Sequence, residues 1–183
     1  ADPVEKKLII LHLIGTHPNY QERYPTTFNK FNSNSNDRVE SDLKARNIDP
    51  WIRSLRNDYD NAVLYEDHLL AKMLDTLRAD RLPDFRSFTV VSDHGNEVGH
   101  ELDYAGHSPT TKAGYQVPVI MWSDKLNLTG VNKDTNLNTA ELDQNLMHIM
   151  GLKDKSSSNH SYWIDQDYRF TPEANWPYWE NKS

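Results

Sequence analysis

Two short apolar runs, separated by a long stretch of helical periodicity, constrain the fold of this chain more than any other feature. Residues 8–14 (LIILHLI) and 88–91 (FTVV) are aliphatic, aromatic or β-branched apart from His12. Such runs are typical of strands buried on both faces of a parallel sheet. The stretch between them, residues 55–82, predicts a helix ending at Pro83, with one stripe of Tyr59, Val63, Leu64, Leu70, Met73, Leu74 and Leu77. Strands that alternate with helices predict an α/β fold with a mainly parallel sheet and helices on both faces.

The remaining segments complete a single domain. Residues 16–50 are polar and predict a long loop with a short helix near residues 39–45. Residues 117–122 predict a third strand, and residues 138–150 an amphipathic helix closed by Gly151. A chain of 183 residues suits one domain with a real core. We expect residues 1–150 to form this α/β core and residues 151–183 to form a tail packed on its surface.

Composition excludes several classes of function. The net charge of −7 argues against nucleic-acid binding, which a basic surface usually drives. No cysteine is present, so disulfides and thiol chemistry are excluded. No apolar run approaches the roughly 20 residues of a membrane-spanning helix. The first run is also too short for a signal peptide.

Asp93 and His94 follow the strand predicted for residues 88–91, and ligands gather at the carboxyl ends of strands in α/β sheets. A carboxylate beside an imidazole suits zinc or manganese. His17 and His107 lie in loops next to the first and third predicted strands, so we expect them at the same edge. The alternative is an N-capping aspartate beside surface histidines. His100 is a competing candidate.

The other histidines are less suited to a site. His12 lies within a predicted strand, which favours a core or supporting position over a ligand. His68 and His148 fall on predicted helices, and His160 falls in the tail. We expect these three to be structural.

Several segments resemble the motifs of bacterial phosphoethanolamine transferases, in the same order along the chain. They are residues 11–17 (LHLIGTH), 23–25 (RYP), 59–65 (YDNAVLY), 91–95 (VSDHG) and 117–122 (VPVIMW), with His107 before the last. The S-D-H-G segment also resembles the metal motif of the wider alkaline phosphatase and sulfatase superfamily. The resemblance covers about residues 8–122 and is nearest to members that modify the lipopolysaccharide core. It implies that this chain is the C-terminal part of a periplasmic, sulfatase-like catalytic domain.

The resemblance also implies roles for four residues. Asp93 and His94 would bind a catalytic Zn²⁺, while His17 and His107 would bind the transferred phosphoryl group or a second metal. Members of this family move phosphoethanolamine from phosphatidylethanolamine to lipid A or a core sugar through a phosphothreonine. The threonine and a metal-binding glutamate would precede residue 1, as would a region in the inner membrane. This chain alone is then expected to be inactive.

Two alternatives remain open. One is a sulfatase, phosphodiesterase or phosphoglycerol transferase of the same superfamily, which a different nucleophile would distinguish. The other is a non-catalytic binding domain that keeps the fold, with the aromatic tail and residues 16–50 as its partner surface.

Overall fold

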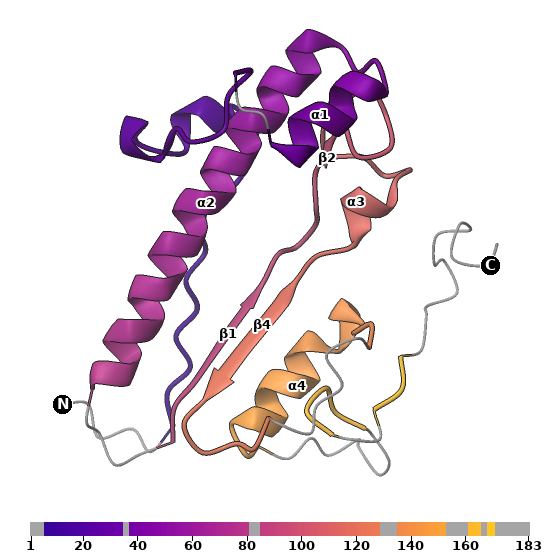
Figure 1. Ribbon diagram of the computed structural model, residues 1–183. Coiled ribbons are helices and arrows are strands. Elements are labelled where there is room, and N and C mark those ends of the chain that lie inside the picture. Colours follow the sequence, from indigo (N-terminus) through magenta and orange to yellow (C-terminus); the bar gives the residue numbers. More distant parts are fainter. Residues whose placement is uncertain are drawn as a thin grey trace. The chain divides into compact units, whose positions relative to one another are not determined.

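The computed structural model describes residues 6–34, 37–80, 85–128, 135–152, 161–165 and 168–170 (Figure 1). The chain divides into two compact units, each treated by itself below. The larger comprises residues 11–84 and 88–120, and the smaller comprises residues 1–10, 85–87 and 121–183. Besides 3-10 turns, the elements are α1 (Arg38–Ala45), α2 (Pro50–Ala79), β1 (Ser87–Val91), β2 (Glu97–Val98), β3 (Ala105–Gly106), α3 (Lys112–Tyr115), β4 (Val119–Ser123) and α4 (Leu142–Ile149).

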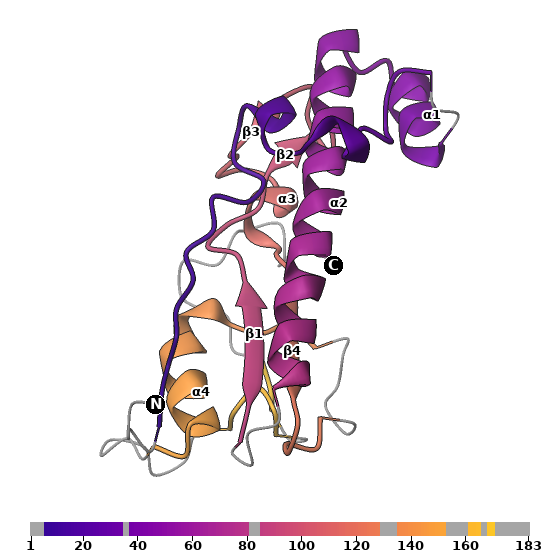
Figure 2. The ribbon, with the colours of Figure 1, turned by 90° about the vertical axis from the view of Figure 1, so that its left-hand side faces the viewer.

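Helix α2 is the longest element of the larger unit (Figure 2). It begins five residues before the predicted start at residue 55, because Asp49 accepts a hydrogen bond from the Trp51 N–H and Pro50 occupies the first turn. It ends at Ala79, and Pro83 lies outside the described residues. Most of the predicted stripe is half-buried, but Val63 is exposed. None of the helices in the described parts of the chain is long and apolar enough to cross a membrane.

A buried ion pair fixes α1 on α2, and the helix predicted near residues 39–45 is confirmed. Asp37 caps α1 by accepting from the Glu40 N–H at 2.8 Å. The Glu40 side chain is only 1% exposed, and its Oε1 lies 2.6 Å from Arg53 Nη1 of α2 and 3.2 Å from Lys44 Nζ. A buried carboxylate needs such partners, because removal from water disfavours its charge.

Asn61 holds the segment before α1 against α2. Its side chain is fully buried, and Oδ1 accepts the backbone N–H groups of Lys30 and Phe31 at 2.7 and 2.9 Å. Its Nδ2 donates to the Phe31 carbonyl at 2.9 Å and also reaches Tyr24 Oη at 3.3 Å. Tyr24 donates in turn to Asp58 Oδ1 at 2.7 Å. The region predicted as a long loop is therefore anchored, and contains 3-10 turns at Tyr20–Glu22 and Thr26–Phe28.

Replacing Asn61 by leucine is expected to lower the free energy of unfolding by about 2–4 kcal/mol, because two backbone N–H groups lose their buried acceptor. Asn61→Asp keeps that acceptor but loses the donor, so we expect a smaller effect. Ser54→Ala, at an exposed position of α2, should change stability by less than about 0.5 kcal/mol. Urea unfolding of the full-length protein measures all three. Equal midpoints for Asn61→Leu and Ser54→Ala would contradict this anchoring role.

The predicted strands at residues 88–91 and 117–122 are confirmed as β1 and β4, which pair in one sheet. Arg86 precedes β1 and bonds through its N–H to Asp124 Oδ1, just after β4, at 2.9 Å. The start of β1 thus adjoins the end of β4, and the two strands run antiparallel. β2 and β3 also pair antiparallel. The described residues therefore confirm the mixture of helices and strands but not a mainly parallel sheet.

The prediction that residues 8–14 form a buried strand is wrong in this structure. The segment has no strand assignment, and Ile9, Ile10 and Ile14 are at least 70% exposed. A strand requires a neighbour to pair its backbone N–H and C=O groups. None of the described strands pairs with this segment. This apolar segment therefore lacks a neighbouring strand that would bury it.

In the smaller unit, α4 confirms the helix predicted for residues 138–150, although a 3-10 turn at Thr139–Glu141 forms its first part. Gly151 closes it with φ +64°, and the Leu152 N–H bonds to the Met147 carbonyl at 2.9 Å. Trp163 is buried, and its N–H donates to Asn145 Oδ1 at 2.7 Å. The described part of the tail thus packs on α4. Residues 153–160, 166–167 and 171–183 lie outside the described residues.

Candidate active site

The loop after β1 is folded by its own polar groups. Ser92 Oγ donates to the His94 carbonyl at 2.7 Å, and Asp93 Oδ1 accepts the His94 N–H at 3.0 Å. These short-range bonds are the local turns that serine and aspartate favour outside helices. They present the Asp93 side chain to solvent, with an exposed fraction of 85%.

The hydrogen bond of the His94 ring determines which nitrogen is free. Nδ1 lies 2.9 Å from the Gly95 carbonyl, which can only accept, so Nδ1 carries the proton of the neutral ring. The lone pair of Nε2 is then available to a metal, as in zinc sites whose histidines are oriented by a carbonyl. Nε2 lies 4.0 Å from Asp93 Oδ1. The two candidate ligands therefore face a common position.

His107 reaches this position through the β2–β3 ladder. Glu97 pairs with Gly106 and Val98 with Ala105. One step further, this register places His107 opposite Asn96, two residues beyond His94. The rings of His94 and His107 lie edge to face, with centroids 4.3 Å apart. The sequence interval of thirteen residues is thus closed by a short hairpin.

Gly95 is required by a close backbone contact rather than by an unusual backbone conformation. Its φ is not positive. Its N–H donates to the Gly114 carbonyl at 3.0 Å, and a Cβ at this position would lie 2.0 Å from the Ala113 carbonyl oxygen. Only glycine therefore allows the backbone of α3 to approach the loop so closely.

The structure connects His17 to the same loop through the backbone. The Thr16 carbonyl accepts a hydrogen bond from Asn96 Nδ2 at 3.2 Å. On the other side lies Glu66 of α2; burial raises the pKa of its carboxyl, and the neighbouring Thr16 backbone lowers that pKa in part. Gly15 has φ +52°, and a Cβ there would lie 2.6 Å from Glu66 Oε1. The turn that carries His17 is therefore held between α2 and Asn96.

Arg23 stabilises the far side of this turn. Its Nε donates to the His17 carbonyl at 3.2 Å, and its Nη2 donates to the Pro18 carbonyl at 3.0 Å. The His17 side chain itself is exposed. Sequence reasoning missed the supporting roles of Arg23, Glu66 and Asn96. The R-Y-P segment after His17 was the available signal for Arg23, whereas Glu66 lies fifty residues away on a helix.

The described residues fit part of a zinc site. Bonds of about 2.0–2.2 Å to nitrogen and oxygen require tetrahedral ligand atoms to lie about 3.4 Å apart. Rotation of the exposed Asp93 side chain shortens the observed 4.0 Å to His94 Nε2 accordingly. Among the residues described, no group of three or more histidine, aspartate or glutamate side chains is arranged to hold a metal. Asp93 and His94 thus offer two ligands of a larger set.

The remaining histidines lie elsewhere. A core position for His12, one of the two positions expected for it, is wrong, because His12 is exposed in segment 8–14. His68 packs against Phe28 with ring centroids 5.1 Å apart, and His148 stacks on Tyr162 at 3.7 Å, which supports structural roles for both. His100 contacts Arg56 at 3.4 Å. His160 lies outside the described residues.

Comparison with protein families decides the membership of the chain. The family described as Sulfatase matches residues 1–152. The chain belongs to the sulfatase family. The S-D-H-G loop, the His107 hairpin and the His17 turn therefore lie within the matched part of a sulfatase-family domain.

Several curated relatives of the chain are named phosphoethanolamine transferases. The chain is 37% identical over 128 residues to phosphoethanolamine transferase EptC of Escherichia coli, covering 68% of this chain and 21% of that protein. It is 33% identical over 125 residues to phosphoethanolamine transferase EptA of Helicobacter pylori, covering 66% and 22%. It is 32% identical over 128 residues to the Kdo(2)-lipid A phosphoethanolamine 7''-transferase of Salmonella typhimurium, covering 68% and 20%. The chain thus spans about a fifth of the length of these relatives. No solved structure matches it significantly.

Proposed function

We propose that this chain contributes to metal-dependent transfer of phosphoethanolamine from phosphatidylethanolamine to a lipopolysaccharide acceptor, either lipid A or a core sugar. One structural observation carries the proposal. The ring centroids of His94 and His107 lie 4.3 Å apart, and the Asp93 carboxylate beside His94 is open to solvent. The names of relatives 32–37% identical to the chain support the reaction class, and the name of the Salmonella relative supports the acceptor.

The proposed chemistry divides the work among four residues. Asp93 and His94 would hold Zn²⁺, with the Nδ1–H bond to Gly95 directing the Nε2 lone pair outward. When bound, zinc neutralises charge on phosphoryl oxygens and lowers the pKa of a coordinated hydroxyl. His107 and His17 would bind the transferred phosphoryl group, add positive charge or donate a proton to the leaving group. The alternative role for these two histidines is to bind a second metal.

The rest of the active site is proposed to come from segments beyond this chain. Those segments would supply the threonine that carries the phosphoethanolamine, a metal-binding glutamate, and anchoring in the inner membrane. Their strands would complete a mainly parallel sheet. Residues 1–150 would then belong to the core of one periplasmic catalytic domain and residues 151–183 to its surface.

The full-length protein tests this function directly. Incubated with phosphatidylethanolamine and lipopolysaccharide, it should release diacylglycerol and add phosphoethanolamine to the acceptor in equal amounts. Prior removal of zinc with a chelator should stop the reaction, and added zinc should restore it. Hydrolysis of a sulfate ester without any transfer would instead support the sulfatase alternative.

Replacing His107 or His17 by alanine is expected to reduce turnover by about 10²–10⁴-fold, which is the usual contribution of a positioned acid or base. The zinc held by Asp93 and His94 should remain bound. Transfer rates and zinc content of the full-length variants measure the two effects separately. If His107→Ala lost zinc as completely as Asp93→Ala, His107 would instead be a ligand of that ion.

A further inference from the structure

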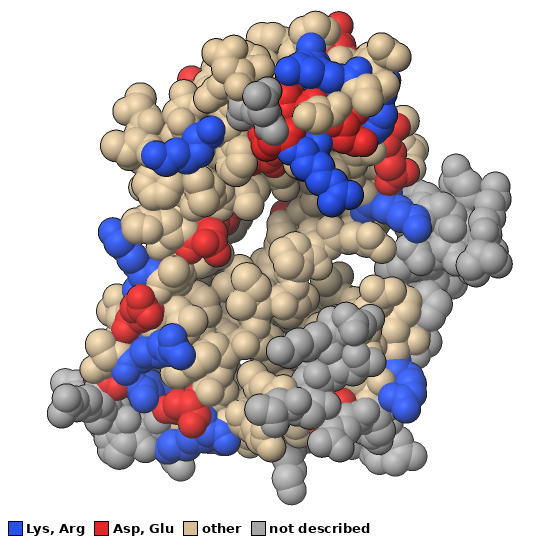
Figure 3. Space-filling model, viewed as in Figure 1, with Lys and Arg blue, Asp and Glu red and all other residues tan. Residues whose placement is uncertain are grey.

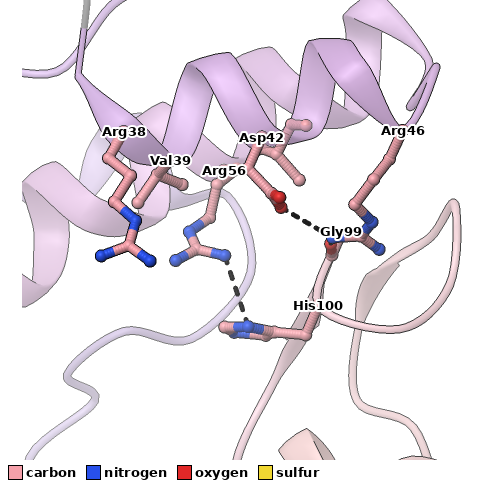
Figure 4. A pocket seen from close by; sticks show the side chains of 8 residues that line it. Arg38, Val39, Asp42, Arg46, Arg56, Gly99 and His100 are labelled. Atoms are coloured by element: carbon pink, nitrogen blue, oxygen red, sulfur yellow. Dashed lines mark hydrogen bonds and ion pairs between the residues drawn. The ribbon is translucent and has the colours of Figure 1, made fainter.

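A second candidate site lies in the larger unit, on the other side of β2 from the S-D-H-G loop. A cavity of about 380 Å³ opens between α1, the first part of α2 and the turn that follows β2 (Figure 4). This volume falls in the range of about 300–1,000 Å³ that small-molecule sites occupy. Its lining residues are Arg38, Val39, Asp42, Leu43, Arg46, Arg56, Gly99 and His100.

Three guanidinium groups line this cavity, and they differ in how they are used. Arg46 Nη1 donates to the Gly99 carbonyl at 2.9 Å, and Arg56 binds Asp60 through Nε at 2.9 and 3.0 Å. Arg38 has no ion-pair partner among the residues that the structure describes. Figure 4 shows the guanidinium groups of Arg38 and Arg56 pointing away from α1 on the side where His100 lies. Arg38 lines the cavity with an exposed side chain, so its guanidinium is accessible to a ligand.

Carboxylates compensate only part of this positive charge. Asp60 is engaged by Arg56, and Asp42 lies 3.4 Å from Arg46 with a side chain that is 61% exposed. The pair at Asp42 is therefore long and solvated, and such pairs contribute little. Charged side chains of both signs gather over α1 (Figure 3), but within the cavity lining three arginines face one aspartate.

His100 adds a neutral donor to the same cavity. Arg56 Nη1 lies 3.4 Å from His100 Nδ1, and arginine can only donate, so Nδ1 accepts and the proton resides on Nε2. Burial, and then the charge of Arg56, lower the pKa of His100. The charges of Glu97 and Asp60 raise the pKa of His100, and the charge of Arg46 lowers it. A neutral ring with a free Nε2–H is what this environment favours.

We propose that this cavity binds a phosphate monoester group. Guanidinium forks match phosphate oxygens with paired, charge-assisted hydrogen bonds. Donors here come from three directions, namely α1, α2 and the turn at His100. That arrangement suits a tetrahedral group with three terminal oxygens better than a planar carboxylate with two. This inference does not depend on the transferase reaction proposed above.

The position of the cavity suggests which phosphate it would take. His94 and His100 are six residues apart in sequence, so their Cα atoms are at most about 22 Å apart. A phosphorylated sugar bound here would therefore contact a residue whose Cα lies at most about 22 Å from that of His94. Free phosphate is the other source of the same chemistry, and binding measurements distinguish the two.

The test is phosphorus NMR of the full-length protein in a background that carries His94→Ala and His107→Ala. That background keeps the S-D-H-G loop from contributing to binding, so the result is separate from the transfer activity. Glucose monophosphate and inorganic phosphate are the probes, and broadening of their signals reports the affinity. Arg38→Gln should weaken binding of the monoester about tenfold, since a hydrogen bond to a charged group is lost. Asp42→Asn should strengthen it, because a competing carboxylate is removed.

Lys72→Gln is the control, because it removes one positive charge from an exposed position of α2 outside the cavity lining. Unchanged binding in this variant supports a local site. Tighter binding of glucose monophosphate than of inorganic phosphate identifies a phosphorylated sugar as the ligand, and equal affinity identifies free phosphate. The proposal is overturned if neither probe broadens, or if Lys72→Gln weakens binding as much as Arg38→Gln.

Discussion

Replacing His94 by alanine is expected to lower the rate of phosphoethanolamine transfer by about a thousandfold or more while the protein stays folded. A catalytic metal stabilises the transition state by several kcal/mol, and each 1.36 kcal/mol corresponds to about a tenfold change in rate. The His94 ring bonds to the carbonyl of its own neighbour Gly95 and contacts His107. Its loss therefore leaves no distant group without a partner. Initial rates, zinc content and urea unfolding of the full-length variant measure the effect.

Two further variants make this result specific. Asp93→Ala should cause a similar loss of transfer and zinc, because it removes the other proposed ligand. The protein should stay folded, because the Asp93 side chain is 85% exposed and, among the described residues, bonds within its own loop. His148→Ala removes a histidine that stacks on Tyr162 in the smaller unit, and should retain both zinc and transfer. Transfer near the wild-type rate in His94→Ala or Asp93→Ala would show that the metal assignment is wrong.

Replacing Gly95 by alanine is expected to impair both stability and transfer. The new Cβ would lie 2.0 Å from the Ala113 carbonyl oxygen, so α3 or the loop must move. Overpacking of this kind typically costs about 1–3 kcal/mol. The displaced residue is the neighbour of His94, and a shift of about 1 Å in a catalytic group can reduce the rate about a hundredfold. Unfolding midpoints and transfer rates should therefore both fall.

Gly151→Ala separates these two effects. Gly151 also has a conformation that disfavours alanine, with φ +64°, but a Cβ there would meet only Lys6 Nζ, at 3.5 Å. The strain should cost about 1–2 kcal/mol without moving the S-D-H-G loop. We thus expect lower stability and normal transfer in Gly151→Ala. If Gly95→Ala behaved in the same way, the close approach of α3 would not determine the position of His94.

Local sequence signals predicted the helices, and they predicted strand β1, which precedes the S-D-H-G loop. The short helix predicted near residues 39–45 is α1, and the long helix predicted after residue 55 is α2. Both could be predicted because capping and periodicity act over only a few residues. The early start of α2 was encoded by Asp49-Pro50 and was overlooked. The prediction of a strand at residues 8–14 was wrong because a strand requires a neighbouring strand, which apolar composition alone does not supply.

The candidate site was partly predictable, because two of its residues are neighbours in the sequence. Asp93 and His94 are adjacent in sequence and follow a strand, so their proximity required no tertiary information. The meeting of His107 with His94 depended on the β2–β3 register, which sequence spacing does not specify. The support of the His17 turn by Glu66 and Asn96 joins segments fifty to eighty residues apart.

The sequence by itself determined the family, the order of most elements and the residues from which a phosphoryl-transfer site could be built. The S-D-H-G segment after a strand was sufficient for a metal-site hypothesis, because adjacent ligands at a strand end share one place in any fold. The tertiary structure decided which histidine joins them, why Gly95 must be glycine and how three arginines come to line one cavity. These features arise from contacts between distant segments, whose geometry is set by packing and hydrogen bonding rather than by local preference.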